Sequence, residues 1–141
     1  MNIAVRYQSR GGNTKAIAEA VAKAAASRAE SVEVPLNGPV DVLFIGGGVY
    51  ASNIDESLQK YIDALNPEFV KTAAVFTTGG FMGATDKISA ALKAKGINVC
   101  EKALPVIMLF KNFMWFRGKG AVKVSEKNRQ LVDEFVKAAI Q

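Results

Sequence analysis

Short apolar runs that alternate with stretches of helical periodicity are the feature that most constrains the fold of this chain. The run VDVLFIGGG at 40–48 is apolar almost throughout, which is typical of a strand buried on both faces of a parallel sheet. The stretch 13–27 instead places Ile17, Ala18 and Val21 at helical spacing. By the same criteria we expect strands at 3–7, 31–34, 40–48, 73–80 and 97–110, and helices at 13–27, 55–65, 84–95 and from Ser125 onward.

The order of these elements predicts a single α/β domain over residues 1–141. Strands that are joined through helices form parallel, doubly wound sheets with helices on both faces. The second strand follows the first helix directly and the third is the most apolar, which favours a five-stranded sheet in the order 2-1-3-4-5. We expect Asn13 to cap the first helix, and the fifth strand to bend or split near 102–105. Ligands of such sheets bind beyond the carboxyl ends of the strands, so the informative loops are 8–14, 46–54, 78–85 and 111–120.

Composition excludes several classes of enzyme. The chain has no histidine, which removes the commonest general base and metal ligand, and with them Ser-His-Asp, Cys-His and His-rich zinc sites. A bound cofactor is therefore the expected carrier of any chemistry. The single cysteine, Cys100, fits a reducing compartment, so we expect a cytoplasmic protein. No apolar run approaches the ~20 residues needed to cross a bilayer, so membrane insertion is not expected.

The positive charge of the chain is unevenly distributed. Residues 111–141 hold seven Lys or Arg and three Asp or Glu, which accounts for +4 of the net +5. A solvated basic helix and a docking face for an acidic partner both fit this pattern. Nucleic acid is not an expected partner, because the basic residues are not densely clustered with exposed aromatics.

The first loop, QSRGGNT at 8–14, lies between an expected strand and an expected helix. The first N–H groups of a helix have no internal partners and carry positive dipole charge, and glycines let the backbone approach a ligand closely. A phosphate site and an ordinary strand-to-helix turn both fit the loop on its own. The spacing matches neither the G-x-x-x-x-G-K-[ST] motif nor the dinucleotide G-x-G-x-x-G motif, so a compact phosphomonoester suits the loop better than a bridging pyrophosphate.

Residues 5–21, VRYQSRGGNTKAIAEAV, resemble the signature of the flavodoxin family. Two positions depart from that signature, Arg6 where an apolar residue is preferred and Gly11 where a second hydroxyl is usual. The resemblance extends over essentially the whole chain and implies a flavodoxin-like three-layer sandwich that binds flavin mononucleotide (FMN). The positions that match are Tyr7, Ser9, Gly12, Thr14, Ala18 and Val21.

The resemblance also implies roles for residues in three loops. Hydroxyl, amide and backbone N–H groups of the first loop would hold the phosphate, and Arg10 would partly compensate for the hydroxyl missing at Gly11. Tyr50 would stack on one face of the isoalloxazine ring, with a core tyrosine as the alternative, and Phe81 would be the second stacking residue. The implied cofactor-binding residues are Ser9, Arg10, Gly11, Gly12, Asn13, Thr14, Gly48, Val49, Tyr50, Ala51, Thr78, Gly79, Gly80 and Phe81.

Two further features distinguish this chain from typical flavodoxins. Ala51 and Ser52 follow Tyr50, where flavodoxins commonly have a glycine whose carbonyl turns toward the flavin. A Cβ penalises that backbone conformation by roughly 1 kcal/mol, so we expect weaker stabilisation of the one-electron-reduced flavin. The apolar run Phe113–Phe116 in the fourth loop is compatible with covering the flavin edge, contacting a partner or packing beneath the last helix.

The function that the resemblance implies is electron transfer between redox partner proteins, by FMN held without a covalent bond. Such partners would be acidic, because a basic protein repels basic ones. One alternative is an FMN-dependent reductase of quinones or other small acceptors. Another is a flavodoxin-like binding module that has lost FMN, an option that Gly11 keeps open.

Overall fold

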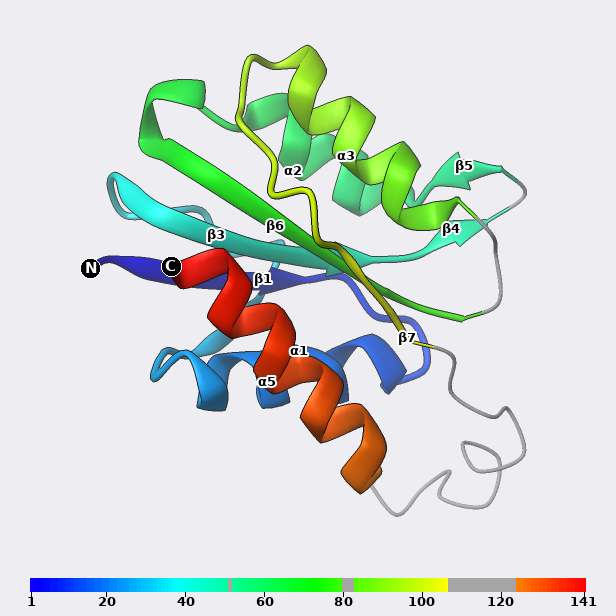
Figure 1. Ribbon diagram of the computed structural model, residues 1–141. Helices are drawn as coiled ribbons and strands as arrows, with labels where there is room; N and C mark the ends of the chain where they lie inside the picture. Colours follow the sequence, from blue (N-terminus) through cyan, green and yellow to red (C-terminus); the bar gives the residue numbers. More distant parts are fainter. Residues whose placement is uncertain (51, 80–82, 107–123) are drawn as a thin grey trace.

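The computed structural model has three layers, with a parallel sheet between two pairs of helices (Figure 1). It describes residues 1–50, 52–79, 83–106 and 124–141. The expectations for Ala51, Gly80, Phe81 and the loop 111–120 therefore lie outside the described residues.

The sheet has five parallel strands in the order β2-β1-β3-β6-β7, which confirms the expected order 2-1-3-4-5. The longest strands, β3 and β6, lie in the middle of the sheet, as their continuous apolar sequence requires. A separate antiparallel hairpin, β4-β5, follows β3 directly and was not expected from the sequence. The strands are β1 (Ile3–Tyr7), β2 (Ala29–Ser31), β3 (Val40–Gly47), β4 (Val49–Tyr50), β5 (Asn53–Ile54), β6 (Val70–Thr78) and β7 (Leu104–Val106).

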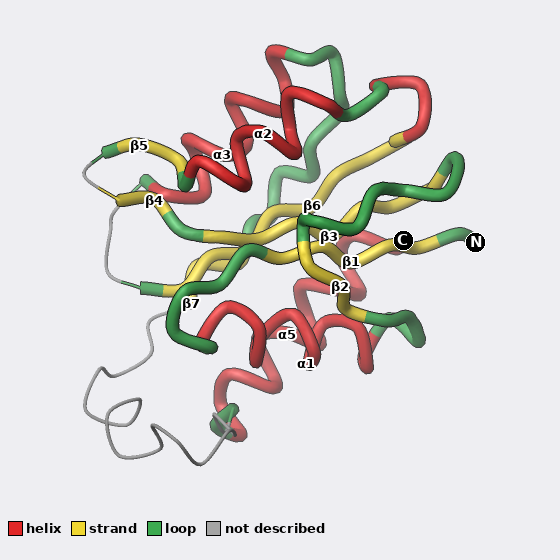
Figure 2. The backbone as a smooth tube through the Cα atoms, turned by 180° about the vertical axis from the view of Figure 1, so that it is seen from behind, coloured by secondary structure: helices red, strands yellow, loops and turns green. Residues whose placement is uncertain are grey.

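Each face of the sheet is covered by two helices (Figure 2). On one face, α1 and α5 enclose a core in which the Phe135 ring meets the Phe44 and Phe76 rings edge to face, at centroid distances of 5.6 and 6.4 Å. On the other face, α2 and α3 bury Leu58 and Ile88. The helices are α1 (Asn13–Ala24), α2 (Glu56–Ala64), the 3₁₀ turn η1 (Pro67–Phe69), α3 (Ala84–Ala94) and α5 (Glu126–Ile140). None of the helices described is long and apolar enough to span a membrane.

The first helix and the second strand differ from the sequence predictions. The expected cap, Asn13, is the first helical residue, and the N-cap is Gly12 in the left-handed conformation. The helix ends at Ala24 rather than at residue 27, because the chain turns at Ala26 with φ of +54°. The expected strand 31–34 is also wrong, since β2 spans Ala29–Ser31 and the segment after it turns away from the sheet.

The segment 32–39 joins β2 to β3 without a helix, and Arg6 holds it in place. This side chain, only 7% exposed, projects from β1. Its Nε donates to the Val34 carbonyl at 2.7 Å, and its terminal nitrogens donate to the carbonyls of Pro35 and Val5, both at 3.1 Å. The departure from the family signature at Arg6 therefore has a structural role: the guanidinium replaces the backbone donors that a helix would supply.

The last two predicted elements are confirmed where the structure describes them. The region from residue 97 is split, because Val99 pairs with Ala73 in an isolated bridge before β7 begins at Leu104. The final helix starts after Ser125, whose hydroxyl accepts a hydrogen bond from the Asn128 N–H at 3.2 Å.

Candidate functional site

Three of the four informative loops begin at one edge of the sheet, the right-hand edge in Figure 1. The register aligns Tyr7 of β1 with Gly46 of β3, and Gly47 of β3 with Thr77 of β6. The carboxyl ends of these strands therefore finish at the same level. The chain therefore leaves these strands side by side, at residues 8, 48 and 79, where ligands of parallel sheets bind.

The first loop presents the beginning of α1 to this edge. The Ser9 hydroxyl accepts a hydrogen bond from the Gly12 N–H at 2.9 Å and closes the loop into a tight turn. Gly12 has φ of +96°, a conformation that glycine adopts without the steric cost of a Cβ. No side chain in the described part of the chain caps α1, so its first N–H groups are free to bind an anion.

A pair of hydroxyl groups joins the first loop to the third. The Oγ1 atoms of Thr14 and Thr78 lie 2.7 Å apart, and Thr14 is buried. Thr14 therefore fixes the beginning of α1 against the end of β6. The chain then turns at Gly79, with φ of +106°.

The second loop is anchored by two hydrogen bonds on Gly48. Its N–H donates to Gln8 Oε1 at 2.9 Å, and its carbonyl accepts from the Asp55 N–H at 3.0 Å. These bonds fix both ends of the β4-β5 hairpin, whose turn includes Ser52 at φ of +67°. Gln8 was not among the predicted site residues, because nothing in one sequence distinguishes it from an ordinary loop residue.

The glycines at the end of β3 make room for the protein's own side chains. A Cβ at Gly46 would collide with the Phe76 ring, and a Cβ at Gly47 would collide with Leu58. Both glycines therefore serve close packing of the core. At Gly48 a Cβ would collide with the ring of Tyr50, so this ring lies against the end of the strand.

Tyr50, Arg10 and Asp55 form a cluster on the exposed side of the hairpin. Tyr50 is 39% exposed, which excludes the alternative of a core tyrosine. The Arg10 guanidinium carbon lies 3.7 Å from the centroid of the Tyr50 ring. The same guanidinium donates to Asp55 Oδ2 from its Nε at 3.3 Å and from a terminal nitrogen at 3.1 Å.

Asp55 is a site residue that sequence reasoning missed. Its Oδ1 caps α2 by accepting from the Ser57 N–H at 2.9 Å, the Ser57 hydroxyl at 2.6 Å and the Leu58 N–H at 3.4 Å. Burial opposes ionisation of this carboxyl, but the hydrogen bonds from Ser57, Leu58 and Arg10 together hold its pKa below the ordinary value. An aspartate just before an amphipathic helix is the signal that could have identified this cap.

These residues fit a phosphate ester that carries a flat ring. The phosphate would lie at the uncapped start of α1, and an exposed aromatic ring lies at the same edge of the sheet. The structure brings to this edge the predicted residues that it describes, namely Ser9, Arg10, Gly11, Gly12, Asn13, Thr14, Gly48, Val49, Tyr50, Thr78 and Gly79.

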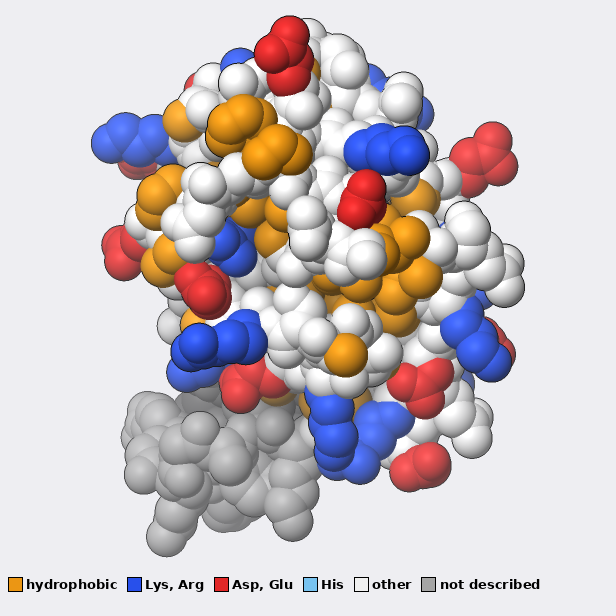
Figure 3. All heavy atoms as spheres, turned by 90° about the vertical axis from the view of Figure 1, so that its left-hand side faces the viewer, with side chains coloured by type: hydrophobic (Ala, Val, Ile, Leu, Met, Phe, Trp, Pro, Cys, Tyr) orange, Lys and Arg blue, Asp and Glu red, His pale blue; other side chains and the backbone are white. Residues whose placement is uncertain are grey.

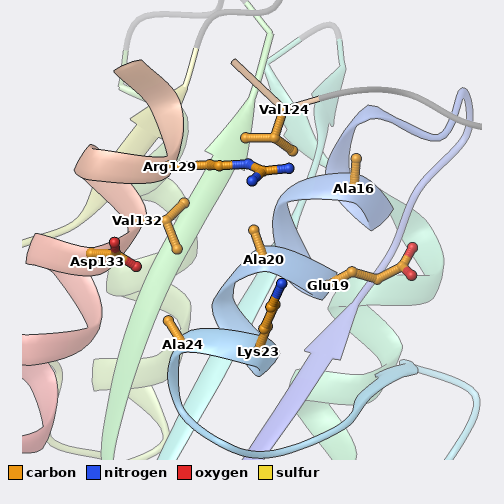
Figure 4. A pocket seen from close by; sticks show the side chains of 9 residues that line it. All are labelled: Ala16, Glu19, Ala20, Lys23, Ala24, Val124, Arg129, Val132 and Asp133. Atoms are coloured by element: carbon orange, nitrogen blue, oxygen red, sulfur yellow. The ribbon is translucent and has the colours of Figure 1, made fainter. Parts of the chain in front are cut away.

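A separate hollow of about 580 Å³ lies between α1 and α5 (Figure 4). Its walls include the small side chains of Ala16, Ala20 and Ala24, together with Arg129 and Asp133 from α5. Among the described residues that line it, the charged side chains are two cations and two carboxylates, which favour no ligand of one sign. We therefore assign it no role in the site.

The comparisons with known proteins agree with the fold described above. The sequence profile described as "Flavodoxin domain" matches residues 4–124 of the chain. No curated protein matches the chain in sequence.

Solved structures share the fold at low sequence identity. A flavodoxin from the domain Archaea superposes with a TM-score of 0.66 at 19% identity, over 100% of both chains. Oxidised Flavodoxin 2 from Bacillus cereus gives a TM-score of 0.71 at 15% identity, over 99% of this chain and 98% of the other. An NADH:FMN oxidoreductase in its apo form gives 0.63 at 15% identity, over 98% and 90% of the two chains.

Proposed function

The chain belongs to the flavodoxin family, and we propose that it binds FMN without a covalent bond and carries electrons between redox partner proteins. The observation that carries this proposal is the meeting of an uncapped helix start, at Gly12, with an exposed aromatic ring, at Tyr50, on one edge of the sheet. Bound FMN would supply the redox chemistry, accepting electrons from a donor and passing them to an acceptor.

The protein's part in this function is to bind and orient the cofactor. Backbone N–H groups at the start of α1 would neutralise the phosphate, and Ser9 holds the loop in the conformation that exposes them. Tyr50 would support one face of the ring. No acid or base is needed for electron transfer, which agrees with a chain without histidine.

Titration of the purified chain with FMN tests the proposal directly. We expect quenching of FMN fluorescence at one equivalent and a yellow complex. Gly12→Ala should weaken FMN binding about 5–30-fold. A Cβ strains a backbone at φ of +96° by roughly 1–2 kcal/mol, so the free loop relaxes away from the conformation that would hold the phosphate and has to regain it on binding.

Gly96→Ala is the matched control for Gly12→Ala. Gly96 has φ of +87° at the far end of α3, so its substitution imposes the same strain away from the site. FMN affinity should be unchanged in this variant. A colourless wild-type chain without FMN affinity would instead favour a binding module that has lost the cofactor.

A reductase of quinones or other small acceptors is the second candidate function. It is supported by the fold shared with an NADH:FMN oxidoreductase over nearly the whole chain. Steady oxidation of NAD(P)H with a quinone, in the absence of another protein, would favour the reductase. Reduction that requires a partner reductase would favour the carrier.

We infer that the partners of the carrier are acidic proteins of the cytoplasm, neither membrane lipids nor nucleic acids. The net charge of +5 would attract such partners and repel basic ones. On the side of the molecule away from the site, the described basic and acidic side chains are interspersed (Figure 3). Electron-transfer rates that fall steeply as salt increases would support an acidic partner.

A further inference from the structure

The contacts of Arg10 point to a role in selecting the ligand. Its backbone belongs to the loop before α1, but its side chain reaches the β4-β5 hairpin. There the guanidinium lies over the centre of the Tyr50 ring at 3.7 Å and pairs with Asp55 at 3.1 Å. Arg10 thus connects the loop that would bind the phosphate to the aromatic ring that would support the flavin.

The two ends of the ion pair differ in how easily they can move. The Asp55 side chain is 8% exposed, and its Oδ1 is committed to the start of α2. The Arg10 side chain is 62% exposed and makes its polar contacts with Oδ2 of the same carboxylate. A ligand that enters the site can therefore displace the arginine, whereas the aspartate stays fixed.

The guanidinium occupies space that a stacking ligand needs. The guanidinium carbon lies 3.7 Å above the centre of the Tyr50 ring, so a flavin ring and the guanidinium cannot both cover that face of the tyrosine. The hydroxyl end of the ring is packed against the Gly48 backbone, which cannot withdraw without breaking its bonds to Gln8 and Asp55. The exposed guanidinium is the group that can leave.

We propose that Arg10 makes the site selective for phosphorylated flavins over flavins without a phosphate. This inference rests on the proposed function. Any flavin ring that stacks on the covered face of Tyr50 has to remove the guanidinium and loses the contact between cation and ring. Only a flavin with a phosphate offers the displaced cation a new anionic neighbour, because the phosphate would lie in the loop that carries Arg10. Riboflavin has the same ring as FMN but no phosphate, so it displaces the arginine without that compensation.

The test measures the dissociation constants of FMN and riboflavin for the cofactor-free wild type and for Arg10→Gln, at low ionic strength. Glutamine keeps a polar side chain but removes the charge. We expect Arg10→Gln to bind riboflavin about 2–5-fold more tightly, because riboflavin no longer has to break an exposed cation–π contact, whose strength corresponds to that range. The same variant should bind FMN more weakly. The dissociation constant of riboflavin divided by that of FMN should therefore be about tenfold smaller in Arg10→Gln than in wild type.

Two further variants separate this role from general electrostatics. Lys15→Gln removes one exposed charge from the first turn of α1, away from the Arg10–Tyr50 contact, and should leave riboflavin affinity unchanged. In a Tyr50→Leu background, Arg10→Gln should no longer raise riboflavin affinity, because the contact that it removes is already absent.

Failure of this inference and failure of the proposed function give different results. If the wild type binds FMN but Arg10→Gln does not raise riboflavin affinity, the selectivity proposal is overturned and the FMN proposal stands. If the wild type does not bind FMN, the proposed function is overturned, and the inference that rests on it falls as well.

Discussion

Replacing the buried arginine of β1 by methionine should cost a large part of the stability of this protein. In Arg6→Met, the carbonyls of Val34 and Pro35 lose charged donors that lie at 2.7 and 3.1 Å. A carbonyl left without its partner costs about 1–2 kcal/mol, and removal of a buried charge recovers part of its desolvation cost. We therefore expect the free energy of unfolding to fall by about 1–3 kcal/mol.

Urea unfolding followed by far-UV circular dichroism measures this loss. With a slope near 2 kcal/mol per molar urea, the midpoint should move down by about 0.5–1.5 M at an unchanged slope. Arg6→Lys keeps the charge but cannot reach several carbonyls at once, so its midpoint should lie between those of wild type and Arg6→Met. Arg129→Met on the exposed surface of α5 is the control and should stay within about 0.5 kcal/mol of wild type. A midpoint in Arg6→Met equal to that of the control would show that Arg6 does not stabilise the segment 32–39.

Two predictions concern other buried polar groups and are checked by unfolding at varied pH. The Tyr61 hydroxyl is buried without a hydrogen-bond partner among the described residues, so Tyr61→Phe should leave stability at pH 7 unchanged or raise it by up to about 1 kcal/mol. Burial raises the pKa of Tyr61, and the nearby charge of Arg6 opposes this only in part. Above about pH 10 the tyrosine therefore ionises more readily in the unfolded chain, and wild type should lose stability. Tyr61→Phe should lose less stability in this range. The lowered pKa of Asp55 contributes stability that is present above its ordinary value of 3.8 and is lost as the pH falls further. Asp55→Asn keeps a capping side chain, so its free energy of unfolding should fall less in acid than that of wild type. An equal loss of stability in the two proteins would contradict this assignment.

The sheet and its order were predictable because they depend on the period of hydrophobicity. Near-continuous apolar runs such as 40–48 fit only a strand with both faces covered, and the alternation with helices then imposes parallel pairing. The boundaries near β2 were not predictable in this way. The segment 31–34 alternates in polarity like a strand, but Arg6 binds the carbonyls of Val34 and Pro35 and holds them away from the sheet.

For the candidate site, too, the sequence predicted the position but not the contacts between residues. Glycines, hydroxyls and an aromatic ring at loop positions such as Gly12, Thr14 and Tyr50 pointed to the edge of the sheet that we propose as the ligand site. Their individual contacts could not be read from the sequence. Thr14 pairs with Thr78, which lies 64 positions away in the chain, and the glycines of β3 accommodate core side chains.

The architecture, the family resemblance and the edge of the sheet with the candidate site could therefore be read from the sequence alone. These features depend on local periodicity and on residue types within short segments. The folded chain was needed to show that Arg6 holds a loop and that Arg10 lies between Asp55 and Tyr50. A guanidinium finds its carbonyl, carboxylate and aromatic partners across distances of 28 to 45 residues, and no local pattern records which of them folding brings within reach.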